Sequence, residues 1–215
     1  MTIRGMLFDL DGTLVDTLGD LAWATNEALR RKGFPTWPEE VYRQMVGNGA
    51  RKLIERALGS AAAPARTEEL LADFLEIYDA HCLCRTQPYE GIPALLESLG
   101  QRKIRLAVVT NKPEAQARKI VHRYFGEDTF AVLFGGVPGR PTKPDPFTTR
   151  EALRILEMKP EEAWFVGDSD VDIETAHRAG LHAAGAIWGF RGEEELRTAG
   201  ADLLLAQPTE ILNFC

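Results

Sequence analysis

Two aspartates that follow the first apolar run of the chain are the residues best suited to chemistry. Asp9 and Asp11 stand two positions apart, and in an extended segment that spacing directs both carboxylates to the same side. Two such charges repel unless a cation offsets them. Mg²⁺, which takes oxygen ligands, would do so while receiving a substrate phosphate, and Gly12 would let the backbone approach that phosphate. The pattern predicts a Mg²⁺-assisted phosphate site, with a solvated acidic turn as the alternative.

Three later segments supply further groups that can hold phosphoryl oxygens or a metal, each after a predicted strand. Thr110 and Asn111 offer a hydroxyl and an amide. Lys143 offers a point charge beside prolines, and Asp168 and Asp172 belong to a carboxylate-rich stretch. Taken singly, each has an ordinary explanation: Thr110 is typical of a turn, Lys143 of a solvated loop charge, and an aspartate at position 170 of a helix N-cap. Their shared position at strand ends favours a single site.

Five short apolar runs predict the strands that must position these residues. Their lack of alternation suits a parallel sheet that is covered on both faces, and the helical patterns between the later runs indicate a doubly wound, Rossmann-like α/β core. A shorter run at 203–205 is a candidate edge strand. The predicted strands are 5–8, 105–109, 131–134, 163–166 and 183–187, and the predicted helices are 113–125, 146–156 and 170–179.

A long stretch after the first strand breaks this alternation and predicts an inserted α-helical cap domain. It begins with apolar residues at helical spacing, continues with the capping-box spacing of Thr36 and Glu39, and predicts a later helix that begins after Thr67. An insert at this point would lie over the carboxyl edge of the sheet, where open α/β proteins bind ligands. The predicted domains are a core of residues 1–15 and 86–215 and a cap of residues 16–85.

In this order, the four polar segments resemble the four motifs of the haloacid dehalogenase-like hydrolase superfamily. The resemblance covers essentially the whole chain. It implies that Asp9 is the nucleophile, which forms an aspartyl-phosphate intermediate, and that Asp11 protonates the leaving alcohol and then activates water. These roles agree with the chemistry, since a carboxylate nucleophile divides the displacement into two easier steps.

The same resemblance assigns the remaining motif residues. Thr110 and Lys143 would orient and neutralise the phosphoryl group, with Asn111 and Gly12 beside it. Asp168 would complete the Mg²⁺ site with Asp9 and the main-chain carbonyl of Asp11. Asp172 would support these ligands from behind. The implied cofactor is Mg²⁺ alone, and the implied partner is a small phosphorylated metabolite.

Asp11, the second aspartate of the first motif, favours a phosphatase among the activities of this superfamily. Members that cleave carbon–halogen bonds lack it, because a halide leaving group needs no proton, and the phosphonate-cleaving members replace it. Sugar-phosphate mutases of the beta-phosphoglucomutase type keep both aspartates and remain an alternative. Phosphatases of other small metabolites, and a non-catalytic binding protein of the same fold, are the further alternatives.

Several stretches, among them 45–50 and 108–113, resemble phosphoglycolate phosphatases, so 2-phosphoglycolate is the predicted substrate. The segment 135–140 departs from that family, which often has an acidic residue after paired glycines. The cap is expected to contribute Asn48 and Arg51 to substrate binding, with Arg51 facing a substrate carboxylate. The alternative for Arg51 is a solvated helix charge.

The overall composition excludes other classes of function. A formal net charge of −7 over 215 residues argues against a nucleic-acid partner, which would need clustered basic residues. No apolar run approaches the length that spans a bilayer, and no signal-peptide pattern opens the chain. We therefore expect a cytoplasmic protein without a membrane partner. The oligomeric state, monomer or dimer, stays open.

Overall fold

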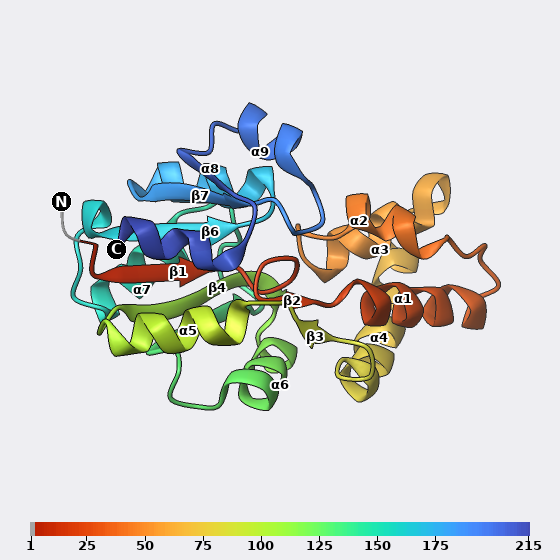
Figure 1. The fold of residues 1–215 in the computed structure, drawn as a ribbon. Helices are drawn as coiled ribbons and strands as arrows, with labels where there is room; N and C mark the ends of the chain where they lie inside the picture. The colour runs from red at the N-terminus through yellow and green to blue at the C-terminus, as the bar shows by residue number, and fades with distance from the viewer. Residues whose placement is uncertain (1–2) are drawn as a thin grey trace.

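The computed structural model describes residues 3–215 and contains a six-stranded parallel sheet with a helical lobe beside it (Figure 1). The strand order is β5-β4-β1-β6-β7-β8, so the first strand of the chain lies inside the sheet. Each strand of this sheet runs parallel to its neighbours. The strands are β1 (Gly5–Phe8), β4 (Arg105–Pro113), β5 (Val132–Gly136), β6 (Ala163–Gly167), β7 (His182–Ala186) and β8 (Leu203–Leu205).

Helices cover both faces of this sheet, which confirms the doubly wound α/β core. Alternate residues of a strand point to opposite faces: Met6 and Phe8 join one hydrophobic cluster, and Leu7 joins the other. One cluster includes α5 (Ile92–Gln101), α6 (Glu114–Phe125) and the C-terminal 3₁₀ helix η4 (Pro208–Phe214). The other includes α7 (Phe147–Ile155), α8 (Asp170–Ala179) and α9 (Glu193–Thr198).

Strand β4 is longer than its apolar run predicts. It continues through polar residues to Pro113, and its register with β5 shifts between Val109 and Pro113. Thr110 and Asn111 therefore lie in the irregular end of β4 rather than after it, which corrects the predicted boundary. Hydrophobic pattern alone ends a strand too early where polar side chains turn toward a site. The run at 203–205 does form the edge strand β8.

Four helices form the lobe at the end of the sheet, and they bury a hydrophobic cluster of their own (Figure 1). The predicted second cap helix does form, as the 3₁₀ helix η1 (Glu39–Val41) and a short α-helix directly after it. Its N-cap is Pro38, however, so the capping-box prediction at Thr36 is wrong. Trp37 precedes Pro38, and a residue before proline disfavours the helical region. The cap helices are α1 (Leu18–Arg31), α2 (Tyr42–Met45), α3 (Ala50–Leu58) and α4 (Pro64–His81).

A two-stranded antiparallel ribbon joins the cap to the sheet. It pairs β2 (Val15–Asp16) with β3 (Gln87–Pro88), and sequence periodicity misses it because each strand has only two residues. We propose that the domain boundaries near residues 16 and 85 lie at this ribbon. Within residues 3–215, no helix combines the length and the apolar character needed to cross a membrane.

Candidate active site

The predicted motif residues meet where the central strands end and face the cap. Asp9 follows β1, Thr110 lies in the last part of β4, and Asp168 follows β6. These three strands are neighbours in the order β4-β1-β6, so their carboxyl ends lie side by side. Lys143 reaches the same place from the loop after β5. All four side chains are buried.

Lys143 lies between two carboxylates. Its Nζ is 3.0 Å from Asp9 Oδ1 and 2.6 Å from Asp172 Oδ1. The second oxygen of Asp172 accepts hydrogen bonds from the Ser169 hydroxyl, at 2.7 Å, and from the Ser169 main-chain N–H. The Asn111 amide holds the main chain of Lys143, accepting from its N–H at 2.8 Å and donating to its carbonyl at 3.1 Å. Both the main chain and the ammonium group of Lys143 are therefore held in place.

The protonation of these groups is perturbed by burial and by one another. Burial raises the pKa of Asp9 to about 6, and the neighbouring Lys143 only partly opposes this effect. Burial also raises the pKa of Asp168 well above its ordinary value, reinforced by Asp172 and Asp9. Burial alone would lower the pKa of Lys143, but Asp172 and Asp9 outweigh it and raise that pKa. One ammonium thus faces three buried carboxylates.

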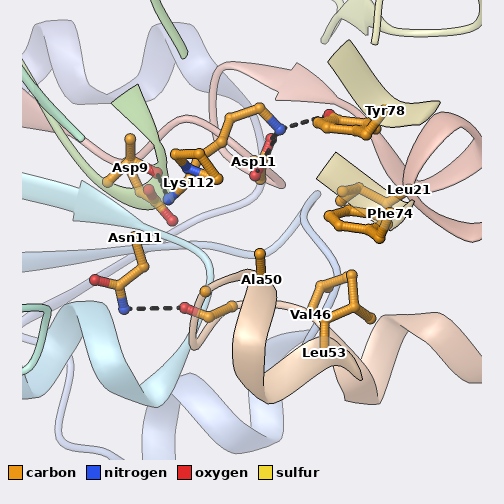
Figure 2. A pocket seen from close by; sticks show the side chains of 14 residues that line it. Asp9, Asp11, Leu21, Val46, Ala50, Leu53, Phe74, Tyr78, Asn111 and Lys112 are labelled. Atoms are coloured by element: carbon orange, nitrogen blue, oxygen red, sulfur yellow. Dashed lines mark hydrogen bonds and ion pairs between the residues drawn. The ribbon is translucent and has the colours of Figure 1, made fainter. Parts of the chain in front are cut away.

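Asp11 lies in a second cluster next to the first. Its Oδ1 accepts a hydrogen bond from the Thr17 hydroxyl at 2.8 Å. Lys112 Nζ lies 2.9 and 3.1 Å from the two Asp11 oxygens and 2.6 Å from the Tyr78 hydroxyl oxygen (Figure 2). Tyr78 belongs to α4, so this cluster joins the core to the cap. Sequence analysis assigned no role to Lys112.

A small cavity of about 40 Å³ separates Asp9 and Asp11 from the cap (Figure 2). Core residues from Thr110 to Pro113 form one wall. The opposite wall is almost entirely apolar and comes from α1, the loop before α3, α3 itself and α4. The cap side chains that line the cavity are Leu21, Val46, Ala50, Leu53, Phe74 and Tyr78.

The structure does not bring the two predicted cap side chains to this cavity. The loop does reach it, through Gly47 and Gly49. Asn48, however, accepts a hydrogen bond from Arg56 Nη2 at 2.7 Å and is absent from the lining. Arg51 is exposed on α3 and forms an ion pair with a glutamate of α4. Their roles in substrate binding remain predictions.

Two glycines allow the first motif to pack against Asp168. Gly12 has a φ of 81°, in the left-handed region that favours glycine. A Cβ at Gly12 would lie 2.2 Å from Asp168 Oδ2, and a Cβ at Gly189 would lie 2.2 Å from Asp168 Cβ. Neither position has room for a side chain. Asp168 therefore occupies the space that these glycines leave.

Comparison with known proteins identifies the family to which the chain belongs. A family model described as haloacid dehalogenase-like hydrolase matches residues 6–186, which include every motif residue described above. The chain belongs to this family. The resemblance seen in the sequence is thereby confirmed, and so is the inserted helical cap that accompanies the fold in this family.

Relatives of nearly the same length act on phosphate esters. The chain is 33% identical to phosphoglycolate phosphatase from Aquifex aeolicus, over 99% of this chain and 96% of the relative. It is also 33% identical to N-acetylmuramic acid 6-phosphate phosphatase from Pseudomonas aeruginosa, over 99% and 95%. A crystal structure of a predicted phosphoglycolate phosphatase from Haemophilus somnus matches with a TM-score of 0.91 and 27% identity, over 100% and 98% of the two chains. The chain is a phosphatase, a phosphoric monoester hydrolase, of the haloacid dehalogenase-like family.

Phosphatases of this family generally use a metal ion, and the residues here fit one. Oxygens of Asp9, Asp168 and Asp172 lie within 4.8 Å of one another, and all three residues are buried. Asp9 Oδ1 is buried, and no donor among residues 3–215 meets it in good hydrogen-bonding geometry, although the Lys143 ammonium lies 3.0 Å away. An all-oxygen set with excess negative charge suits a hard divalent cation.

Phe190 is a second residue whose position the sequence did not reveal. Its main-chain N–H donates to Asp168 Oδ2 at 2.8 Å, while its side chain is buried in the hydrophobic cluster of the cap. Phe190 thus links a candidate metal ligand directly to the cap. The sequence signal was the resemblance of the stretch 188–190 to phosphoglycolate phosphatases, which assigns no role to Phe190.

Proposed function

We propose that the protein is a Mg²⁺-dependent phosphatase that hydrolyses 2-phosphoglycolate through an aspartyl-phosphate formed on Asp9. The observation that carries this proposal is the environment of the Asp9 carboxylate. One of its carboxylate oxygens is buried and has no well-oriented hydrogen-bond donor in the described part of the chain. It lies beside Lys143 and next to a cavity that Asp11 also lines. An oxygen with a free lone pair and a cation beside it is arranged to attack phosphorus.

The reaction proceeds in two displacements. In the first, an Asp9 oxygen bonds to phosphorus, the ester P–O bond breaks, and Asp11 gives its proton to the leaving alcohol oxygen of glycolate. In the second, Asp11 takes a proton from water, the water oxygen bonds to phosphorus, and the Asp9–phosphorus bond breaks. Inorganic phosphate leaves, and both aspartates are restored. Proton transfer by a carboxyl group placed in this way contributes about 10²- to 10⁴-fold.

The other motif residues hold the phosphoryl group and its charge. Lys143 neutralises phosphoryl oxygens, Thr110 donates a hydroxyl to them, and Asp172 keeps the lysine in place. Mg²⁺ would be held by Asp9, Asp168 and the Asp11 carbonyl, and it would supply positive charge to the phosphoryl oxygens. Burial of the whole group strengthens each of these interactions, because water screens them little.

The substrate proposal is supported by the relatives and by the apolar character of the cap wall. Two-carbon phosphoglycolate is the substrate named for the Aquifex aeolicus relative. The substrate named for the Pseudomonas aeruginosa relative is a sugar ester, whose hydroxyl groups need hydrogen-bond partners. The apolar cap wall offers few partners for sugar hydroxyls. The smaller ester is therefore favoured.

Phosphate release measured over a panel of esters tests the proposal. The panel contains 2-phosphoglycolate, N-acetylmuramic acid 6-phosphate, sugar phosphates, nucleotides and pyrophosphate, each with and without Mg²⁺. We expect the highest kcat/KM for 2-phosphoglycolate, and a loss of about 10³-fold or more in Asp9→Asn. Asp128→Asn, which changes an exposed carboxylate far from the motifs in sequence, serves as the control and should match wild type.

Each other outcome has a distinct meaning. A flat profile that depends on Asp9 would keep the phosphatase and discard 2-phosphoglycolate. Phosphoryl transfer between hydroxyls of a bisphosphorylated sugar, with little phosphate released to water, would indicate a mutase. Turnover that is unchanged in Asp9→Asn would refute the aspartyl-phosphate mechanism.

A further inference from the structure

Lys112 has a position that the mechanism above does not use. It lies in β4 next to the motif residues Thr110 and Asn111, and its side chain is only 1% exposed. Within the described residues, it is the only cationic side chain that lines the cavity beside Asp9 and Asp11. Nothing in the phosphoryl-transfer steps requires a second lysine, because Lys143 already neutralises the phosphoryl group.

We propose that Lys112 binds the second anionic group of the substrate, which is the carboxylate of 2-phosphoglycolate. The proposal rests on the function proposed above and names the residue that would give it its specificity. Lys112 would determine which esters are hydrolysed, while the phosphoryl-transfer machinery would be the same for all of them.

The location of the ammonium fits this role. Lys112 Nζ contacts both oxygens of Asp11, at 2.9 and 3.1 Å. Asp11 must reach the leaving oxygen of the ester, so a group attached close to that oxygen also comes close to Lys112. In 2-phosphoglycolate, the carboxylate is bonded to the carbon that carries the leaving oxygen. A two-carbon acid phosphate therefore places its second charge near this lysine.

The cap residue Tyr78 fixes the ammonium at this point. Its hydroxyl oxygen lies 2.6 Å from Lys112 Nζ, and its ring centroid lies 4.6 Å away (Figure 2). An ammonium has three N–H donors and behaves as a compact point charge. Lys112 can therefore keep its bond to Tyr78 while it turns another donor from Asp11 to a substrate carboxylate.

Apart from Tyr78, the described cap side chains that line the cavity offer no partner for a carboxylate. Leu21, Val46, Leu53 and Phe74 present apolar groups, against which an ionised carboxylate would be unpaired. The other basic candidate, Arg51, is exposed and paired outside the cavity. Lys112 is thus the place where a second substrate charge can be paired.

Two esters that differ only in that charge test the proposal. We would measure kcat and KM for 2-phosphoglycolate and for 2-hydroxyethyl phosphate, in which a hydroxymethyl group replaces the carboxylate. Wild type should prefer the acid. Lys112→Met should reduce the ratio of the two kcat/KM values about 10-fold or more, mainly through the KM for the acid, because one charge-assisted contact is lost. Lys112→Arg, which keeps the charge, should retain part of the preference.

The control and the outcomes separate this inference from the proposed function. Lys52→Met removes an exposed cationic side chain of α3 that pairs with Glu55 outside the cavity, and it should leave the ratio unchanged; an equal fall there would show that the ratio reports the general charge of the cap and would overturn the inference. If Lys112→Met slows both esters equally, the lysine acts only through Asp11 and the inference is wrong, while 2-phosphoglycolate stands. If wild type shows no preference for the acid, the proposed substrate and the inference fall together. Should thermal melting show Lys112→Met to be unfolded, Lys112→Gln replaces it.

Discussion

The charges around Asp9 are the feature of single residues with the widest consequences. Asp9, Asp168 and Asp172 lie close together in a buried place, where the ammonium of Lys143 contacts Asp9 and Asp172. Burial of like charges disfavours their ionised forms, as the pKa of about 6 for Asp9 shows. The arrangement destabilises the metal-free protein at neutral pH and favours a cation that offsets the charge.

This imbalance predicts a pH-dependent stabilisation by Mg²⁺. The pKa of Asp9 is raised from 3.8 to about 6 on folding, so the folded protein holds the proton more tightly. The metal-free protein therefore loses stability from this group as pH rises through that window. A metal needs the ionised carboxylate, so the increase in Tm on adding Mg²⁺ should be larger at pH 7.5 than at pH 5. Calorimetry measures it, and Asp9→Asn should weaken the difference. An equal increase at both pH values would contradict this.

At the scale of the elements, the join between cap and core is held by a buried carboxylate. Asp20, in the first turn of α1, accepts hydrogen bonds from the main-chain N–H groups of Arg85 and Thr86 and from the Thr86 hydroxyl, at 2.8 to 3.0 Å. Asp20 therefore connects the first cap helix to the segment that leads from the cap into β3. Asp20 is thus one of the side chains that hold the cap in position.

Removal of this carboxylate should destabilise the protein markedly. Asp20→Ala leaves buried donors without a partner, so we expect the free energy of unfolding to fall by about 2 to 4 kcal/mol. Urea denaturation in saturating Mg²⁺ measures the change. Asp73→Ala removes a cap carboxylate that forms a partly exposed ion pair with Lys32, and its cost should stay below about 1 kcal/mol. Equal losses in the two variants would show that Asp20 does not hold the join between cap and core.

At the scale of the whole molecule, the cap lies closed over the ends of the strands. Phe190, from the core, packs inside the hydrophobic cluster of the cap. Arg191 Nη2 donates to the Val46 carbonyl at 2.8 Å, and Asn111 Nδ2 donates to the Gly47 carbonyl at 3.2 Å. A substrate must enter between these contacts, so we expect the cap to open and to close again before transfer, which excludes water.

Loss of one cap contact should shift this equilibrium without touching the chemistry. In Arg191→Ala, the closed form is less populated, so the KM for 2-phosphoglycolate should rise several-fold. Small-angle scattering should give the free variant a larger radius of gyration than wild type, and compaction with Mg²⁺ and a phosphate analogue. Arg197→Ala removes an exposed arginine that pairs within α9, and it serves as the control. Identical scattering and KM for both variants would argue against opening.

The sequence by itself determined the sheet and the group of candidate residues around Asp9. Buried strands produce apolar runs, and the polar residues at their ends are adjacent to those runs in the chain. Asp9, Thr110 and Asp168 could therefore be placed at one edge before any coordinates. Local pattern failed at the end of β4, at the two-residue strands β2 and β3, and at Thr36, where the influence of Pro38 outweighed a capping pattern.

Only the tertiary structure decided which side chains meet across the cap. Lys112 is separated from Asp11 by 101 positions, and Asp20 from Thr86 by 66. No local pattern encodes such pairs, because each depends on how α1 and α4 pack over the sheet. The same packing turned Arg51 outward to a glutamate of α4 and left Lys112 as the cation in the cavity. Side-chain direction on a cap helix is set by that packing and not by position in the sequence.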